Sequence, residues 1–144
     1  MDEWIDMHIG PRAMKYFIER RLTPVAESVG LKPTYGPFLM TVREKEGLSL
    51  KTLSEMMIVD KALTTRVTKH LIEGGYLEDR GINTREYSLY LTSKGREATE
   101  KISCAIRNAW KELLCDLTDD EIECLKAIHA KIDRRVRSDM EAQR

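Results

Sequence analysis

Residues 76–95 read YLEDRGINTREYSLYLTSKG, and they predict one β-hairpin in a chain whose other segments have helical periodicity. Tyr87, Leu89 and Leu91 recur at every second position, which is the pattern of a half-buried strand. A shorter partner strand opens the stretch, and Gly81 favours a turn between the two. Because an isolated two-stranded ribbon is barely stable in water, this hairpin must pack against neighbouring elements.

Length and composition predict one domain, 1–144, large enough to bury about 68–70% of the surface that the unfolded chain exposes. Charged residues make up 33% of the chain and cancel to a net charge of zero, so total charge neither favours nor excludes a nucleic-acid partner. No apolar run approaches the roughly 20 residues of a membrane span, and the acidic N-terminus does not resemble a signal peptide. We therefore expect a cytoplasmic protein with no membrane partner.

Helical segments precede and follow the hairpin. Gly10-Pro11 predicts the start of a first helix, because proline suits the first turn, and Gly30 predicts its end. Pro24 predicts a kink or a restart within it. A second helix is expected up to Gly47.

Helix caps can be predicted at four further positions. Ser49 is expected to cap a short helix, and Asp60 is expected to cap the next one. Thr92 or Ser93 is expected to cap a long helix after the hairpin. Thr118, with a glutamate three residues later, has the pattern of a capping box and predicts a final helix.

The helix after Asp60 has two contrasting faces. Leu63, Val67 and Leu71 lie within about 80° of each other around the helix and form the predicted buried stripe. Short side chains let a helix approach the floor of a DNA groove, threonine contacts bases or phosphates, and basic residues neutralise phosphates or read guanine. The arc opposite the buried stripe carries only such short or basic side chains, and it is therefore a candidate DNA-binding face. The alternative interpretation is that this arc is an ordinary solvent-exposed helix face. Its residues are Lys61, Ala62, Thr65, Arg66 and Lys69.

Two capped helices joined by a tight connection and followed by a hairpin have the order of a winged helix-turn-helix. We therefore predict a mainly α fold with one β-hairpin wing, in which the reading head at 48–95 is flanked by dimerisation helices at 1–30 and 96–144. A wing of this kind can contact the phosphate backbone of DNA or enter the minor groove. The alternative is that the arginines of the wing only neutralise the charge of neighbouring carboxylates. Wing contacts are predicted at Arg80, Asn83, Thr84 and Arg85, and backbone anchors at Ser49, Lys51 and Thr52.

Residues 48–95, LSLKTLSEMMIVDKALTTRVTKHLIEGGYLEDRGINTREYSLYLTSKG, resemble the MarR family of transcriptional regulators. The likeness lies in the two capped helices, the Gly-Tyr-Leu entry into the wing and the closing Leu-Thr-x-x-Gly. It implies a homodimer that binds a palindromic operator in double-stranded DNA. Two departures stand out. Asn83 takes the place of the aspartate in the family's Asp-x-Arg wing motif, which ends here at Arg85, and Thr64 and Thr68 occupy positions that are commonly aliphatic.

Apolar stripes in the flanking helices exceed what one small domain can cover, which favours a second copy of the chain as partner. In proteins that resemble this one, the terminal helices of two subunits form a two-fold dimer. Such a dimer presents two recognition helices about one DNA turn apart, ~34–36 Å. Packing of the stripes within one chain is the alternative. The predicted interface residues are Leu113, Leu114, Leu117, Ile128, Ile132 and Val136.

The resemblance also implies a possible small-molecule effector, such as an aromatic acid, that releases the protein from DNA. An effector of this kind acts through different affinities for two spacings of the reading heads. Candidates to line its pocket are Tyr16, Tyr35, Phe38 and Met40, with simple core packing as the alternative. The scattered histidines give no metal pattern, and no phosphate loop or nucleophile motif is present, so we expect no metal, no cofactor and no enzyme.

Two other function classes remain open. A winged-helix protein-interaction module without DNA binding predicts acidic side chains lying over Lys61 and Lys69. A thiol-based redox switch would use Cys104, Cys115 or Cys124, none of which lies in a Cys-x-x-Cys pair. The simpler interpretation of these cysteines is that they are small buried hydrophobic residues in a reducing compartment.

Overall fold

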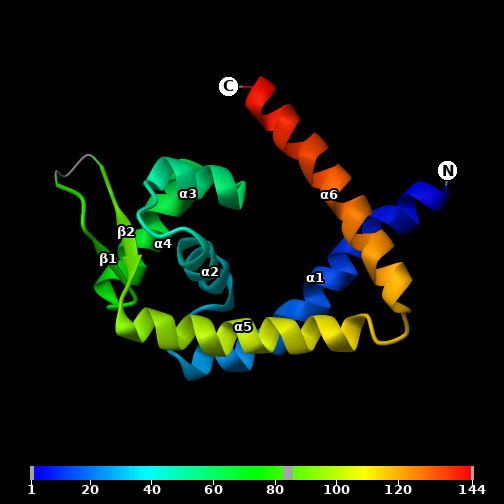
Figure 1. Cartoon of the computed structure of the whole chain (residues 1–144), viewed down its shortest axis with the longest axis horizontal. Helices are drawn as coiled ribbons and strands as arrows, with labels where there is room; N and C mark the ends of the chain where they lie inside the picture. The colour runs from blue at the N-terminus through cyan, green and yellow to red at the C-terminus, as the bar shows by residue number, and fades with distance from the viewer. Residues whose placement is uncertain (1, 83–85, 144) are drawn as a thin grey trace. The chain divides into compact units, whose positions relative to one another are not determined.

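The computed structural model describes residues 2–82 and 86–143, and the side chains of 10–82 and 86–143 (Figure 1). This part of the chain contains six α-helices, one short 3-10 helix and a two-stranded antiparallel hairpin. The predicted mainly α fold with one β-hairpin wing is confirmed. The elements in chain order are α1 (Asp2–Ser28), η1 (Pro33–Tyr35), α2 (Gly36–Glu44), α3 (Leu50–Met57), α4 (Lys61–Glu73), β1 (Leu77–Asp79), β2 (Leu89–Leu91), α5 (Ser93–Leu113) and α6 (Asp119–Ala142).

The chain forms two compact units, 1–109 and 110–144, with the boundary near the end of α5. The first unit holds α1 to β2 and most of α5, and the second holds the last residues of α5 and all of α6. The expectation of one domain over the whole chain stays a prediction.

The core of the first unit is built from helices and hairpin together. Leu39 of α2, Leu53 of α3, Leu71 of α4, Leu89 of β2 and Ile102 of α5 have no exposed surface at all. Burying a leucine or isoleucine side chain in this way contributes about 1.5–3 kcal/mol relative to leaving it in water. α2 packs against β2 and α4 packs against β1, so the hairpin has the neighbours that a short ribbon requires (Figure 1).

α1 is longer than the sequence predicts. It begins at Asp2 rather than at Gly10-Pro11, so the predicted start is wrong. It also continues through Pro24, which excludes the predicted restart, and the alternative of a kink at Pro24 stays a prediction. A proline inside a helix removes one backbone hydrogen bond, and a long helix keeps the bonds on either side. The predicted end is confirmed, because Gly30 has a φ of 75° and its amide donates to the Glu27 carbonyl at 3.0 Å.

The hairpin has one more backbone neighbour than the sequence predicts. Leu77 pairs with Leu91 in the antiparallel register of β1 and β2. On its other edge, β2 bonds to the segment before α3: the Gly47 amide donates to the Leu89 carbonyl at 2.7 Å, and the Leu89 amide donates to the Leu48 carbonyl at 3.0 Å. The wing is thereby attached to the helix-turn-helix through main-chain hydrogen bonds.

Candidate nucleic-acid interface

α3 and α4 form the predicted helix-turn-helix. Ser49 caps α3, because its Oγ accepts a hydrogen bond from the Thr52 amide at 3.1 Å. Asp60 caps α4 in the same way, with its Oδ1 accepting from the Leu63 amide at 2.7 Å. The connection turns at Ile58, which has a φ of 55°, a left-handed conformation that is uncommon for a β-branched residue.

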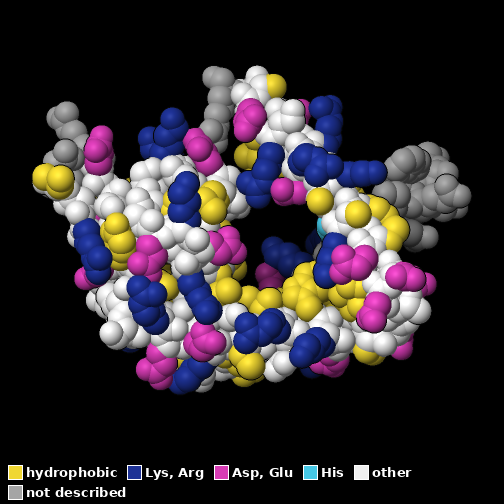
Figure 2. All heavy atoms as spheres, viewed as in Figure 1, with side chains coloured by type: hydrophobic (Ala, Val, Ile, Leu, Met, Phe, Trp, Pro, Cys, Tyr) yellow, Lys and Arg dark blue, Asp and Glu magenta, His cyan; other side chains and the backbone are white. Residues whose placement is uncertain are grey.

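The predicted DNA-facing arc of α4 is exposed in full: Lys61, Ala62, Thr65, Arg66 and Lys69 all face solvent. None of its three cations forms an ion pair within the described ranges. The Thr65 hydroxyl donates to the Lys61 carbonyl at 2.8 Å, which leaves its oxygen as an acceptor. Both signs of charge are spread over the face drawn in Figure 2, so this cationic arc is a local feature and not a consequence of net charge.

The buried face of α4 is wider than the predicted stripe. Val67 and Leu71 are buried and Leu63 is half-buried, while Thr64 and Thr68 are buried as well. The Thr64 hydroxyl donates to the Asp60 carbonyl at 2.9 Å. The Thr68 hydroxyl has no hydrogen-bond partner among the described residues, so α4 carries one buried polar group without compensation.

The anchors predicted on α3 differ in exposure. Lys51 is exposed, whereas Ser49 and Thr52 are half-buried and bound to each other, with their hydroxyl oxygens 3.0 Å apart. These two hydroxyls already have partners in the cap of α3. Lys51 is therefore the more available of the predicted anchors for a phosphate.

The wing is fastened by an aspartate that the sequence did not single out. Asp79 Oδ1 accepts hydrogen bonds from the amides of Gly81 at 2.8 Å and Ser88 at 2.9 Å, and so ties the two arms of the hairpin together. The ladder continues beyond β1, since the Arg80 amide donates to the Ser88 carbonyl at 2.9 Å. The predicted wing contacts Asn83, Thr84 and Arg85 lie outside the described residues.

Arg80 is exposed, and its guanidinium contacts two side chains of the wing. Its Nε donates to Glu78 Oε1 at 2.8 Å, and its Nη2 donates to the same oxygen. The guanidinium carbon also lies 4.2 Å from the centre of the Tyr90 ring. Of the predicted wing contacts, Arg80 is the one that the structure describes.

The base of the wing explains the Leu-Thr-x-x-Gly ending. Thr92 caps α5, because its Oγ1 accepts from the Gly95 amide at 3.0 Å, and its own amide donates to the Tyr76 carbonyl at 3.1 Å. The Tyr76 hydroxyl donates to the Val29 carbonyl at the end of α1. Main-chain and side-chain bonds thus connect the wing to both helices that flank the reading head.

The second unit exposes large hydrophobic side chains. Leu117, Ile128, Ile132 and Val136 are 39%, 48%, 54% and 43% exposed, and no described residue of α6 is buried. Leu113 and Leu114, the other predicted interface residues, are half-buried.

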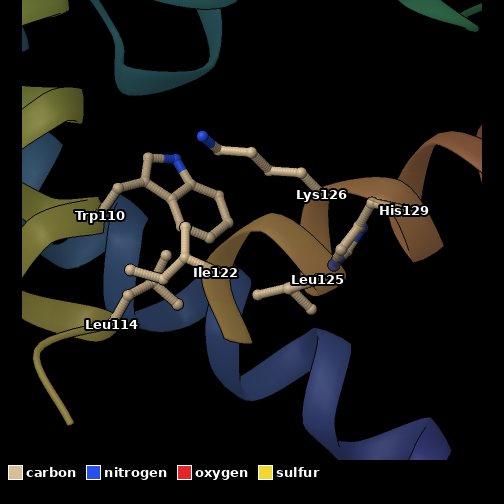
Figure 3. Close-up of a pocket in the computed structure, with 6 residues that line it drawn as sticks. All are labelled: Trp110, Leu114, Ile122, Leu125, Lys126 and His129. Atoms are coloured by element: carbon tan, nitrogen blue, oxygen red, sulfur yellow. The ribbon is translucent and has the colours of Figure 1, made fainter. Parts of the chain in front are cut away.

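An apolar groove of about 360 Å³ lies between the end of α5 and α6, within this unit. Trp110 of α5 and Leu114, the residue after α5, line it from one side, and Ile122 and Leu125 of α6 line it from the other, together with Lys126 and His129 (Figure 3). Trp110, Ile122 and Leu125 were not among the predicted interface residues, although Ile122 and Leu125 belong to the apolar series predicted for the final helix. The i, i+3 spacing of Ile122, Leu125 and Ile128 places them on one face of α6, which is the signal that would assign the first two to this groove.

The four ligand candidates lie in different surroundings. Phe38 is buried in the core, and Tyr35 and Met40 pack against it, as the core-packing alternative expects. Tyr16 is 63% exposed, so core packing is wrong for this residue. It lines an open pocket on α1 together with Ala13, Phe17, Arg20 and Arg21.

The three cysteines are all exposed, so the interpretation of Cys104, Cys115 and Cys124 as small buried hydrophobic residues is wrong. Helical spacing places Cys104 and Cys115 on one face of a helix but does not say whether that face is buried. The Cys104 sulfur has one weak contact, an Asn108 side-chain amide at 3.8 Å. Exposure is a condition for the redox alternative, which stays a prediction.

Two negative observations concern the described residues alone. No group of three His, Cys, Asp or Glu side chains in them is placed to hold a metal ion. Within the same ranges, every helix is too short or too polar to cross a bilayer.

No protein-family model matches the chain. Over 96 residues, the chain is 28% identical to the HTH-type transcriptional regulator PapX of Escherichia coli, a match that covers 65% of this chain and 58% of PapX. The chain therefore spans less than two thirds of the length of this curated relative.

Solved structures match more completely. A MarR protein from Peptoclostridium difficile has a TM-score of 0.82 and 24% identity, over 96% of this chain and 90% of that one. A MarR family transcriptional regulator from Listeria monocytogenes, complexed with a 26mer DNA, has a TM-score of 0.82 and 19% identity, over 94% of this chain and 89% of that one. The resemblance of 48–95 to the MarR family thus extends over nearly the whole chain, at the level of the fold.

Proposed function

We propose that this chain is a MarR-family transcriptional regulator that binds a palindromic operator as a homodimer and has no enzymatic activity. The observation that carries the proposal is the arc of Lys61, Ala62, Thr65, Arg66 and Lys69 on α4. It is exposed, it contains no acid, and its cations have no ion-pair partner among the described residues. The arc therefore offers its full positive charge to DNA phosphates.

The fold supports this proposal because the arc belongs to the second helix of a helix-turn-helix followed by a wing. One structure of the same fold was solved with a DNA 26mer, and PapX is a helix-turn-helix regulator. The protein-interaction alternative predicts acids lying over Lys61 and Lys69. Neither lysine forms an ion pair in the residues that the structure describes, which counts against that alternative.

The dimer is supported by the second unit. α6 has no buried residue within the described ranges. A helix with an apolar face is stabilised when that face is buried against another element and removed from water. The exposed Ile128, Ile132 and Val136 lie on α6, the helix whose earlier residues Ile122 and Leu125 line the apolar groove. We infer that a second copy covers this surface, and that the resulting two-fold axis relates the two reading heads.

The test is binding of the purified protein to a fragment carrying its own promoter region, at several salt concentrations and with random DNA as competitor. Specific binding that falls steeply with salt is expected, because each phosphate neutralised releases counterions. Equal and weak binding to both DNAs would contradict the proposal. The same assay, repeated with small aromatic acids, tests whether an effector releases the complex.

A further inference from the structure

The outward face of the wing carries a cluster of three side chains. Glu78 and Tyr90 are directly opposed across β1 and β2, so their side chains point to the same face of the hairpin. Arg80 follows Glu78 by two residues and returns to that face. Leu77 and Leu89 lie in the core, so the cluster occupies the side of the wing that the core does not use.

The contacts hold the guanidinium of Arg80 on two sides. Glu78 takes the edge formed by Nε and Nη2, and the Tyr90 ring supports the flat face at 4.2 Å. The edge formed by Nη1 and the second Nη2 hydrogen has no partner within the described residues. Because this edge can bind an oxyanion with two parallel hydrogen bonds, a held arginine can still bind a phosphate.

We propose that Arg80 binds a phosphate of the DNA backbone, and that Glu78 and Tyr90 are positioning residues that aim its guanidinium at that phosphate. The proposal rests on the proposed DNA-binding function and adds a role for an acid on the DNA-facing side of the wing. Holding one rotamer of a long side chain before binding removes part of the ordering cost of the complex.

Positioning and simple charge predict opposite results for Glu78. Removing a negative charge beside DNA strengthens binding if charge alone matters. If Glu78 positions Arg80, then Glu78→Gln weakens binding by about two- to five-fold, the scale of an exposed ion pair. Glu73→Gln is the matched control, because Glu73 is an exposed acid of the same unit that does not touch Arg80. It is expected to bind as tightly as wild type or slightly more tightly.

The experiment is a double-mutant cycle, measured as the affinity for the promoter fragment across a salt series, with urea midpoints to verify folding. Arg80→Ala is expected to weaken binding about ten-fold or more and to lower the salt slope by about one. In the Arg80→Ala background, Glu78→Gln is expected to have no further effect. Tyr90→Phe, which keeps the ring face, is expected to retain more affinity than Tyr90→Leu.

The effect of Glu78→Gln on DNA affinity, measured with and without Arg80, distinguishes a positioning role of Glu78 from a simple charge effect. Tighter binding by Glu78→Gln, or an equal effect of this change with and without Arg80, overturns the positioning role while leaving wild-type DNA binding intact. A wild-type protein that shows no salt-dependent DNA binding overturns the proposed function and this inference together. Weakening by Glu78→Gln that disappears in the Arg80→Ala background supports the inference.

Discussion

A Cβ atom added at Gly95 would lie 2.0 Å from the backbone carbonyl oxygen of Tyr76. That oxygen belongs to the main chain at the base of the wing and already accepts a hydrogen bond from the Thr92 amide, so it cannot rotate away. We expect Gly95→Ala to lower the free energy of unfolding by at least about 1–3 kcal/mol, the usual cost of overpacking. Urea denaturation followed by circular dichroism measures this change.

Gly10→Ala is the matched control for this prediction. Gly10 lies inside α1, and a Cβ added there meets nothing within 4 Å. Alanine loses less backbone freedom than glycine on entering a helix, but a Cβ at the residue before Pro11 is disfavoured by the proline ring, so the two effects oppose each other. We expect this change to alter the free energy of unfolding by less than about 1 kcal/mol. Equal urea midpoints for the two variants would show that the wing base relaxes freely around residue 95.

The unpartnered hydroxyl of Thr68 gives a second prediction. Replacing it with valine keeps the shape of the side chain and removes a buried polar group that has no hydrogen-bond partner in the described part of the chain. We expect Thr68→Val to raise the free energy of unfolding by about 1 kcal/mol. Thr64→Val, which removes a hydrogen bond to the Asp60 carbonyl, is expected to give no such gain. A loss of stability in Thr68→Val would mean that this hydroxyl has a partner in solution.

The cationic arc of α4 gives a third prediction, which concerns DNA affinity. Lys69→Ala and Arg66→Ala are each expected to weaken binding to the promoter fragment and to lower its salt slope by about one per lost phosphate contact. Lys101→Ala removes the same charge from α5, where this lysine lies 3.3 Å from Glu97, and it is expected to leave the slope unchanged. If all three variants had the same slope as wild type, the arc would not be the DNA contact.

The apolar face of α6 gives a fourth prediction, which concerns oligomeric state. Ile132→Glu places a charge where we propose that a second copy packs, and burying an unpaired charge is costly. Analytical ultracentrifugation is expected to show a shift from dimer to monomer. Ala130→Glu adds the same charge two residues earlier, on roughly the opposite side of the helix, and is expected to remain dimeric. A dimeric Ile132→Glu variant would place the interface elsewhere.

Much of the local structure could be predicted from the sequence because it depends on neighbouring residues. The caps at Ser49, Asp60 and Thr118 each need only an oxygen and an amide three residues later, and all three are present. The capping box is complete, with the Thr118 amide donating to Glu121 Oε2 at 2.8 Å. The strand that contains Leu89 was also predictable, because the alternation of apolar and polar residues that indicates a strand involves only residues close together in the sequence.

Contacts between distant residues could not be predicted in this way. The hydrogen bonds of Gly47 and Leu48 to Leu89 join positions that share no sequence pattern, and the two amides bound by Asp79 are brought together only when the hairpin closes. Periodicity predicted which side of α4 is exposed. It did not reveal that Glu78 and Tyr90 hold Arg80, because that cluster depends on the register of the two strands.

The bonds of residues 47–48 to Leu89 also bear on the kinetics of DNA recognition. They attach the wing to the segment that leads into α3, so under the proposed function α4 and the base of the wing would approach DNA as one preassembled body. Little folding then accompanies association, so encounter should be limited by diffusion and orientation rather than by loop ordering. In the proposed homodimer, any switch in DNA affinity would accordingly have to change the separation of the two reading heads rather than the shape of each.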